Sequence, residues 1–127
     1  MNERFKFRAW LPELKKMVYP TVIRFVSKGI AIEYEDDGQR CADGPGWFEL
    51  MQCTGLRDRN GTLIFEGDIL DGSWATPEDP MRFTVKWYDI HACFNLVWAN
   101  TGAFEIVGNI HDNPELLRDN PGLLEGE

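Results

Sequence analysis

Two acidic residues that are close together in the chain could carry acid/base chemistry. Glu66 and Asp68 flank Gly67 between two apolar stretches, and neighbouring carboxylates can differ in pKa and share a proton-transfer step. Side chains on either side of a tight turn need not converge, however. Gly67 is expected to adopt a positive φ, and Asp68 is expected to accept backbone N–H bonds within the turn. We therefore interpret Glu66, Gly67 and Asp68 as a structural turn.

Metal binding and nucleophilic catalysis have weaker support. His91 and Cys93 form a His-x-Cys pair, and His111 with Asp112 could add two ligands. Zinc sites use three or four ligands at recognisable paired spacings, which are missing here. The sequence has neither GxxxxGK[ST] nor GxGxxG, and its two histidines lie in no nucleophile motif. We predict no catalytic residue, no metal and no cofactor, and hence no enzyme.

Nucleic-acid binding is the alternative function that the residue pattern favours. A predicted strand near the start carries alternating basic side chains and a tryptophan, and two lysines lie across the following turn. Basic groups for phosphates beside an aromatic ring for base stacking would suit a single-stranded nucleic acid. The competing interpretation is a solvated strand face or a subunit contact. The candidate interaction residues are Arg4, Lys6, Arg8, Trp10, Lys15 and Lys16.

The distribution of charge bears on these alternatives. Residues 1–28 contain seven basic and two acidic side chains, a net charge of +5, which leaves −13 for the remainder of a chain whose total is −8. The acidic remainder would repel a nucleic-acid backbone. Segments of opposite charge could instead meet between chains. We expect a homo-oligomer in which the basic N-terminal hairpin packs against the acidic C-terminal part of a neighbour, with another protein as a further candidate partner.

The elements that would position these residues are mostly strands. Aromatic residues make up 13% of the chain, and 12 glycines with 7 prolines supply turns, a composition that favours sheet. Period-2 alternation predicts a strand at residues 5–10, a turn at 11–15 and a partner strand at 16–19. Residues 21–26 and 30–34 predict a second hairpin. Residues 35–46 are acidic and lack periodicity, so we interpret them as a mobile surface loop.

The second part of the chain continues the strand pattern. A loop is predicted at 71–80, and Asn60-Gly61 favours a tight hairpin. Asn113 as an N-cap followed by Pro114 predicts a short helix at 114–118, and residues 120–127 are expected to be frayed. Strands are predicted at 47–54, 62–65, 69–70, 81–88, 94–98 and 104–110.

Together these patterns predict a mainly β fold with little α-helix. Residues 1–46 would form an N-terminal β-hairpin region with an acidic loop. Residues 47–127 would form an SH3-like β-barrel with a short C-terminal helix and a frayed tail, because short strands recur at intervals of roughly 8–12 residues.

The cysteines and the hydropathy pattern indicate a cellular compartment. Cys41, Cys53 and Cys93 form no C-x-x-C motif, and no signal sequence or apolar run long enough to cross a bilayer is evident. We expect three reduced thiols in a cytoplasmic protein that does not contact a membrane.

Four segments in series resemble the YopX family of small phage and prophage proteins. Their order and spacing extend from residue 5 to residue 117. The segments read FKFRAW at 5–10, QCTGLRDRNG at 52–61, IFEGDIL at 64–70 and EIVGNIHDNPELL at 105–117. The sequence departs from the family pattern at Leu11, where an acid is usual, and at Cys53 and His111, where aromatic residues are common.

The resemblance implies a protein that a phage encodes and that is located inside the bacterial host cell. The role of this protein is undetermined. The resemblance also implies a β-rich fold with an SH3-like C-terminal part, a tendency to self-associate and no assigned active residue. We therefore expect an accessory protein that acts as a non-enzymatic binding or assembly module.

Overall fold

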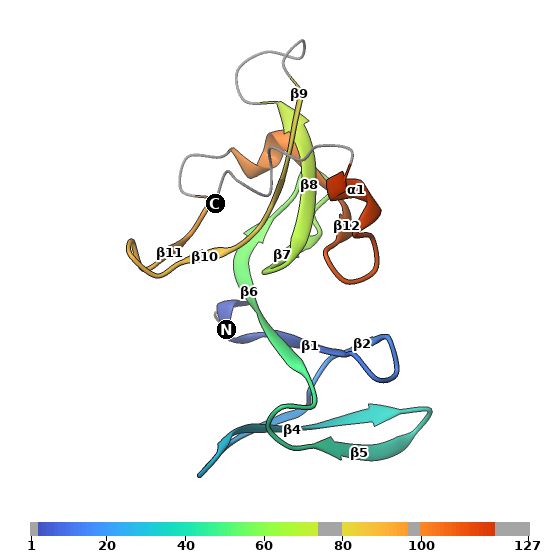
Figure 1. Cartoon of the computed structure of the whole chain (residues 1–127). Coiled ribbons are helices and arrows are strands. Elements are labelled where there is room, and N and C mark those ends of the chain that lie inside the picture. The colour runs from blue at the N-terminus through green and yellow to red at the C-terminus, as the bar shows by residue number, and fades with distance from the viewer. Residues whose placement is uncertain (1–2, 74–79, 97–99, 119–127) are drawn as a thin grey trace. The chain divides into compact units, whose positions relative to one another are not determined.

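The fold is mainly β, with one short α-helix near the C-terminal end (Figure 1). The computed structural model describes residues 3–73, 80–96 and 100–118. The chain forms two compact units. The hairpin unit is Phe5–Gln52, and the C-terminal unit comprises the described residues of Met1–Arg4 and Cys53–Glu127. The division falls after Gln52 rather than after Gly46, because residues 49–52 pair with a strand of the hairpin unit.

The first ladder of the hairpin unit confirms the first predicted hairpin. Strand β1 (Phe7–Leu11) pairs antiparallel with β2 (Lys16–Val18), with Trp10 opposite Met17. The other edge of β1 pairs with the beginning of β6 (Glu49–Arg57). Strand β1 is therefore central, and four of its five residues in succession are buried.

The second ladder contains a strand that the sequence did not predict. Strands β3 (Val22–Val26) and β4 (Gly29–Asp36) form the predicted second hairpin, and β4 also pairs with β5 (Gln39–Asp43). The prediction of a mobile acidic loop at 35–46 is therefore wrong over most of that segment. Asp37 and Gly38 both have positive φ, 52° and 78°, and such a two-residue turn matches the twist of an antiparallel hairpin.

The core of the hairpin unit draws on both ladders. Its buried members come from β1, β2 and β4, and residues of β3, β5 and β6 pack against them. Burial of these aliphatic and aromatic groups supplies the main stabilisation of the unit. The buried residues are Ala9, Leu11, Val18, Ile32 and Tyr34.

The C-terminal unit begins with a bulged strand pair. Strand β6 continues past Cys53 and pairs with β7 (Leu63–Phe65), but the register shifts between Cys53 and Arg57. The strand predicted to end at residue 54 continues through Gly55, which has a φ of 83° within the irregular part. Positive φ at a glycine is a common way to form a β-bulge. Gly61, with a φ of 82°, completes the predicted Asn60-Gly61 turn.

Three strands form the main sheet of the C-terminal unit. Strand β8 (Asp68–Ser73) is central, between β9 (Pro80–Thr84) and β12 (Phe104–Asn109). The predicted loop at 71–80 is thus shorter, because β8 extends to Ser73 and β9 starts at Pro80; residues 74–79 lie outside the described part of the chain. The predicted strand at 104–110 is confirmed as β12.

The amphipathic stretch predicted as one strand at 81–88 is split in two. Strand β9 ends at Thr84, and β10 (Trp87–Tyr88) forms a separate ribbon with β11 (Cys93–Phe94), drawn in yellow and orange in Figure 1. The side chain of Asn95 stabilises the interruption between β9 and β10. It accepts a hydrogen bond from the Lys86 N–H (3.0 Å) and donates one to the Thr84 carbonyl (2.7 Å). Residues 97–98 of the predicted return strand lie outside the described residues.

Short helical turns complete the described chain. The 3₁₀ helices are η1 (Glu3–Phe5) and η2 (Thr101–Ala103), and Asn100 caps η2. The predicted terminal helix is confirmed as α1 (Glu115–Arg118). Residues 120–127, predicted to be frayed, lie outside the described residues.

One apolar cluster forms the core of the C-terminal unit. It draws on β7, β8, β12 and the segments flanking β10 and β11, with Phe83 and Phe104 in edge-to-face contact at 5.3 Å between ring centroids. The strand pairings described here do not by themselves close an SH3-like barrel, so the barrel stays a prediction. The buried members are Ile64, Leu70, Val85, Leu96 and Phe104.

Candidate functional site

The predicted basic and aromatic platform is not exposed as a whole. Lys6 and Lys15 are exposed, whereas Arg8 and Trp10 are only 6% and 9% exposed. The expectation that Arg8 and Trp10 project from one solvent face of β1 is therefore wrong. Polar residues alternate with apolar ones in the sequence, but an arginine or tryptophan can bury most of its length within a strand that is covered on both faces. A buried Trp10 cannot stack on a base. The remaining candidate, Arg4, is exposed in the C-terminal unit.

Several basic groups of the hairpin unit are neutralised within that unit. Lys16 forms an ion pair with Asp36 of β4, and this hydrogen bond raises the pKa of Lys16. Arg24 and Arg40 both contact Glu33, at 2.8 and 3.2 Å, and their hydrogen bonds lower the pKa of Glu33.

The neutralisation is also evident in the whole unit. Phe5–Gln52 contains seven basic and seven acidic residues, so its net charge is zero. The basic first 28 residues fold together with the β4–β5 hairpin, residues 29–43, which contains five acids and one arginine. The strong positive charge of the early sequence is therefore balanced inside the unit, which removes most of its attraction for a polyanion.

The Glu66-Gly67-Asp68 turn has the geometry expected from its sequence. Gly67 has a φ of 90°, and the buried carboxylate of Asp68 (3% exposed) accepts the Phe65 N–H at 2.7 Å. The Gly67 N–H and carbonyl bond to Val85 and Ile110. The turn thus joins β7 and β8 to the segments that follow β9 and β12, and this gives Asp68 a structural role.

A second buried carboxylate, which sequence reasoning missed, organises the loop after β6. Asp58 is 6% exposed, and its two oxygens accept the backbone N–H groups of Asn60 (2.9 Å), Thr62 (3.0 Å) and Ile106 (3.0 Å). Burial by itself would raise the pKa of Asp58, but the three N–H donors outweigh it and lower the pKa. The Asp58-x-Asn60-Gly61 spacing is a local signal for such a turn.

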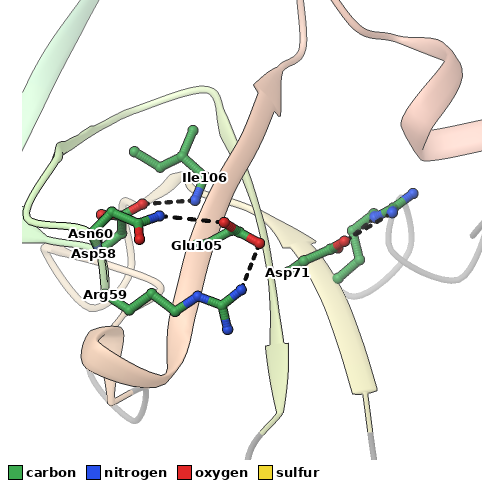
Figure 2. Close-up of polar contacts among 7 residues, drawn as sticks. Asp58, Arg59, Asn60, Asp71, Glu105 and Ile106 are labelled. Carbon is green, nitrogen blue, oxygen red and sulfur yellow. Dashed lines mark hydrogen bonds and ion pairs between the residues drawn. The ribbon is translucent and has the colours of Figure 1, made fainter.

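Glu105 adds an exposed layer to the same loop. Figure 2 shows Asp58, Arg59 and Asn60 facing β12, where Glu105 accepts bonds from Arg59 (2.6 Å) and Asn60 (3.3 Å). The Arg59 backbone N–H also donates to the Phe104 carbonyl at 2.9 Å. The loop between β6 and β7 is therefore fastened to β12 by both backbone and side-chain bonds.

A cross-strand ion pair connects the main sheet to the terminal helix. Arg82 of β9 contacts Asp71 of β8 through two nitrogens, at 2.6 and 3.0 Å, and also donates to the Leu116 carbonyl at 3.1 Å. A two-pronged guanidinium–carboxylate pair fixes orientation better than a single contact. Its geometry indicates a role in holding α1 against the sheet.

The sequence-derived metal candidates do not come together. Cys93 pairs with Tyr88 in the ribbon, and the His91 ring contacts the Tyr88 ring at 6.4 Å between centroids. Within residues 3–73, 80–96 and 100–118, no cluster of three or more His, Cys, Asp or Glu residues could hold a metal ion. The helices of this part of the chain are all too short or too polar to span a bilayer.

Several large apolar side chains of the described chain are exposed. Six of the large ones belong to the hairpin unit, where Phe25 of β3 is 85% exposed; in the C-terminal unit, Ile90 at the tip of the β10–β11 ribbon is 93% exposed. Large exposed apolar groups often mark contact surfaces. The six of the hairpin unit are Phe5, Leu14, Tyr19, Phe25, Val26 and Trp47.

The fold and these surfaces define a small β-rich protein whose buried carboxylates hold turns together. The family described as YopX protein matches residues 6–118, and the chain belongs to the YopX family. No curated protein matches the chain.

Two solved structures are similar. Protein EF1440 from Enterococcus faecalis is 29% identical, with a TM-score of 0.62 over 88% of this chain and 96% of its own. Protein yopX from Bacillus subtilis is 21% identical, with a TM-score of 0.63 over 92% of this chain and 99% of its own, and shares the fold.

Proposed function

We propose that this protein is a non-enzymatic binding or assembly module that associates with copies of itself through the hairpin unit. The observation that carries the proposal is the group of six exposed apolar side chains on that unit, among them Phe25 and Trp47. A small β unit has few faces of its own to bury, and two chains that share a contact bury more. A different protein is the second candidate partner for the surface that these side chains form.

The charges of the hairpin unit support an apolar contact. Because Lys16 and Arg24 are paired within the unit, attraction to the acidic part of a neighbouring chain would act mainly on the orientation of the partners. Apolar burial would supply most of the binding free energy. We therefore expect only a weak dependence of the assembly on salt concentration.

The roles of the buried carboxylates support a non-enzymatic function. General acid/base catalysis needs a carboxyl group that can reach a substrate. The Asp58 and Asp68 carboxylates instead accept backbone N–H bonds inside the C-terminal unit. Both groups are explained by the turns that they hold.

Matched serine variants test the assembly surface. Phe25→Ser and Trp47→Ser should each shift the protein towards the monomer in light scattering. Ile90→Ser, a change at a still more exposed apolar residue of the C-terminal unit, should leave the mass unchanged. An unchanged mass in both hairpin-unit variants would refute the assigned surface. A lower mass in the Ile90 variant alone would indicate that the contact lies at the β10–β11 ribbon instead.

Nucleic-acid binding remains the alternative function. Within the hairpin unit it is now restricted to the exposed lysines Lys6 and Lys15. It is the weaker candidate because Trp10 is buried and the hairpin unit carries no net charge. Fluorescence anisotropy with a labelled single-stranded oligonucleotide distinguishes nucleic-acid binding from the proposed assembly function. Binding that weakens steeply with salt and is lost in Lys6→Ala/Lys15→Ala would favour the nucleic-acid function.

The proposal includes an SH3-like barrel for the C-terminal unit. Its support is the bond between the Arg59 N–H and the Phe104 carbonyl (2.9 Å), which joins the loop after β6 to the first residue of β12. Slow amide hydrogen exchange at Arg59 and Ile106 in the native protein would agree with a closed barrel. Rapid exchange at both would argue for an open sheet.

A phage or prophage origin and a cytoplasmic location complete the proposal. They rest on the family and on three cysteines, all in the described chain and none in a disulfide. The genes that flank this one in its genome test the origin. A neighbourhood of phage genes supports it, and a conserved set of host housekeeping genes opposes it.

A further inference from the structure

The turn that Asp58 organises contains a chemically labile pair of residues. Asn60-Gly61 is the only asparagine–glycine step in the sequence. In such a step the backbone nitrogen of the glycine can attack the side-chain amide carbon of the asparagine, and the absence of a glycine side chain leaves that approach unhindered. Both residues are exposed, and no heavy atom beyond Gly61 and its two chain neighbours lies within 4 Å of the place where a Gly61 Cβ would be.

The folded turn restrains both reacting groups. The Gly61 N–H, the attacking group, donates to the Asp58 carbonyl at 3.0 Å. The Asn60 side-chain nitrogen, the leaving group, donates to Glu105 at 3.3 Å (Figure 2). The Gly61 carbonyl is held by Arg57 at 2.7 Å. Cyclisation requires the Asn60 amide to leave Glu105 and turn towards the Gly61 nitrogen.

We propose that Asn60 is a deamidation site whose reaction rate is set by its bond to Glu105. The Gly61 nitrogen loses its proton to water and forms a bond to Asn60 Cγ. The bond from Cγ to the side-chain nitrogen then breaks, and ammonia leaves. Water opens the resulting succinimide at either carbonyl, which gives aspartate or isoaspartate at position 60. No oxidant or enzyme is needed.

The product changes how the loop contacts β12. A carboxylate at position 60 replaces the N–H donor to Glu105 with a second negative group, and the two repel each other or compete for Arg59. Isoaspartate also lengthens the backbone between residues 60 and 62, whose N–H groups both bind the same oxygen of Asp58. Deamidation therefore loosens the loop from β12 irreversibly.

The reaction rate tests the proposal. The purified full chain is incubated at mildly alkaline pH, and peptide mass spectrometry follows each asparagine in the wild type, Glu105→Ala and Arg59→Ala. Arg59→Ala breaks the same ion pair but keeps Glu105 as the acceptor for Asn60, so it controls for lost stability. Asn60 should react first in all three proteins, and several-fold faster in Glu105→Ala alone. Equal acceleration in both variants, or earlier reaction at another asparagine, overturns the proposal.

A product mimic tests the consequence independently. Asn60→Asp should lower the urea midpoint of unfolding at neutral pH, and the loss should shrink in a Glu105→Gln background, where the like charge is absent. An Asn60→Asp protein with the wild-type midpoint, or with the same loss in both backgrounds, would show that the altered residue does not act through Glu105.

Discussion

The Asp58 carboxylate accepts a hydrogen bond from the Ile106 backbone N–H at 3.0 Å, although 48 residues separate the two in the chain. The same side chain closes its own turn through Asn60 and Thr62. One buried group thus joins a local loop to a distant strand. Buried carboxylates with several N–H donors contribute strongly to stability, because their removal leaves each donor without an acceptor.

The first prediction concerns this carboxylate. Asp58→Ala should lower the free energy of unfolding by about 2 kcal/mol or more, because three backbone N–H groups lose their acceptor. Urea denaturation measures the change. Asp89→Ala, which removes an exposed acid from the turn between β10 and β11, is the control and should have little effect. Similar losses in both variants would contradict the role assigned to Asp58.

The second prediction is the acid dependence of stability. The pKa of Asp58 is lowered from its ordinary value of 3.8 in the folded protein, so the folded state binds this proton less readily than the unfolded state. The stabilisation is present above pH 3.8 and is lost as the pH falls through the lower, folded-state pKa. Asp58→Asn should therefore flatten the acid limb of a plot of unfolding free energy against pH. A variant with an unchanged acid limb would assign the dependence to other groups.

The third prediction concerns alkaline pH. Burial, followed by the hydrogen bond that Tyr34 donates to Asp43 at 3.0 Å, raises the pKa of Tyr34 to about 12. The sign is opposite to that of Asp58, because the raised pKa favours the protonated form in the folded state. The contribution of Tyr34 to the free energy of unfolding is complete below pH 10 and is lost as the pH rises towards 12.

Tyr34→Phe keeps the ring and removes the hydroxyl. It should cost about 1 kcal/mol at neutral pH and should abolish the part of the alkaline destabilisation that comes from this residue. Thermal unfolding across the alkaline range measures both effects. A variant that loses stability at high pH as steeply as the wild type would count against this assignment.

The fourth prediction concerns the turn between β7 and β8. Gly67 has a φ of 90°, a conformation that a β-branched side chain avoids, so Gly67→Val should destabilise the protein by about 1 kcal/mol or more. Gly44→Val is the matched control, because Gly44 has no positive φ and only its own chain neighbours lie within 4 Å of its Cβ position. The strain argument fails if the two variants unfold at the same urea concentration.

The sequence predicted most strands because their signal is local. Alternation of residue types located β1 and β2, and an apolar, β-branched stretch followed by a turn located β3 and β4. The turn residues Gly67 and Gly61 were recognised from their neighbours. Strand β5 was missed because the four acids of residues 35–46 suggested a solvated loop. The Asp37-Gly38 dipeptide was the overlooked hairpin signal, and Lys16 and Tyr34 bind two of the acids, Asp36 and Asp43.

The candidate site was harder to predict because burial depends on tertiary contacts. The alternation in β1 correctly gave a strand but placed Arg8 and Trp10 on a solvent face. A strand covered on both faces usually shows a continuous apolar run, so the polar residues of β1 concealed its burial. Likewise, the turn around Asp58 could have been read from the sequence, whereas its bond to Ile106 depends on the fold of the C-terminal unit.

Self-association is the central claim, and the mass of the wild-type chain in solution tests it most directly. Light scattering at micromolar concentration and moderate salt gives that mass without reference to shape. We predict a value that is a multiple of the 14.6 kDa chain mass and that changes little as the salt concentration is raised. A single species at 14.6 kDa under these conditions would contradict the claim.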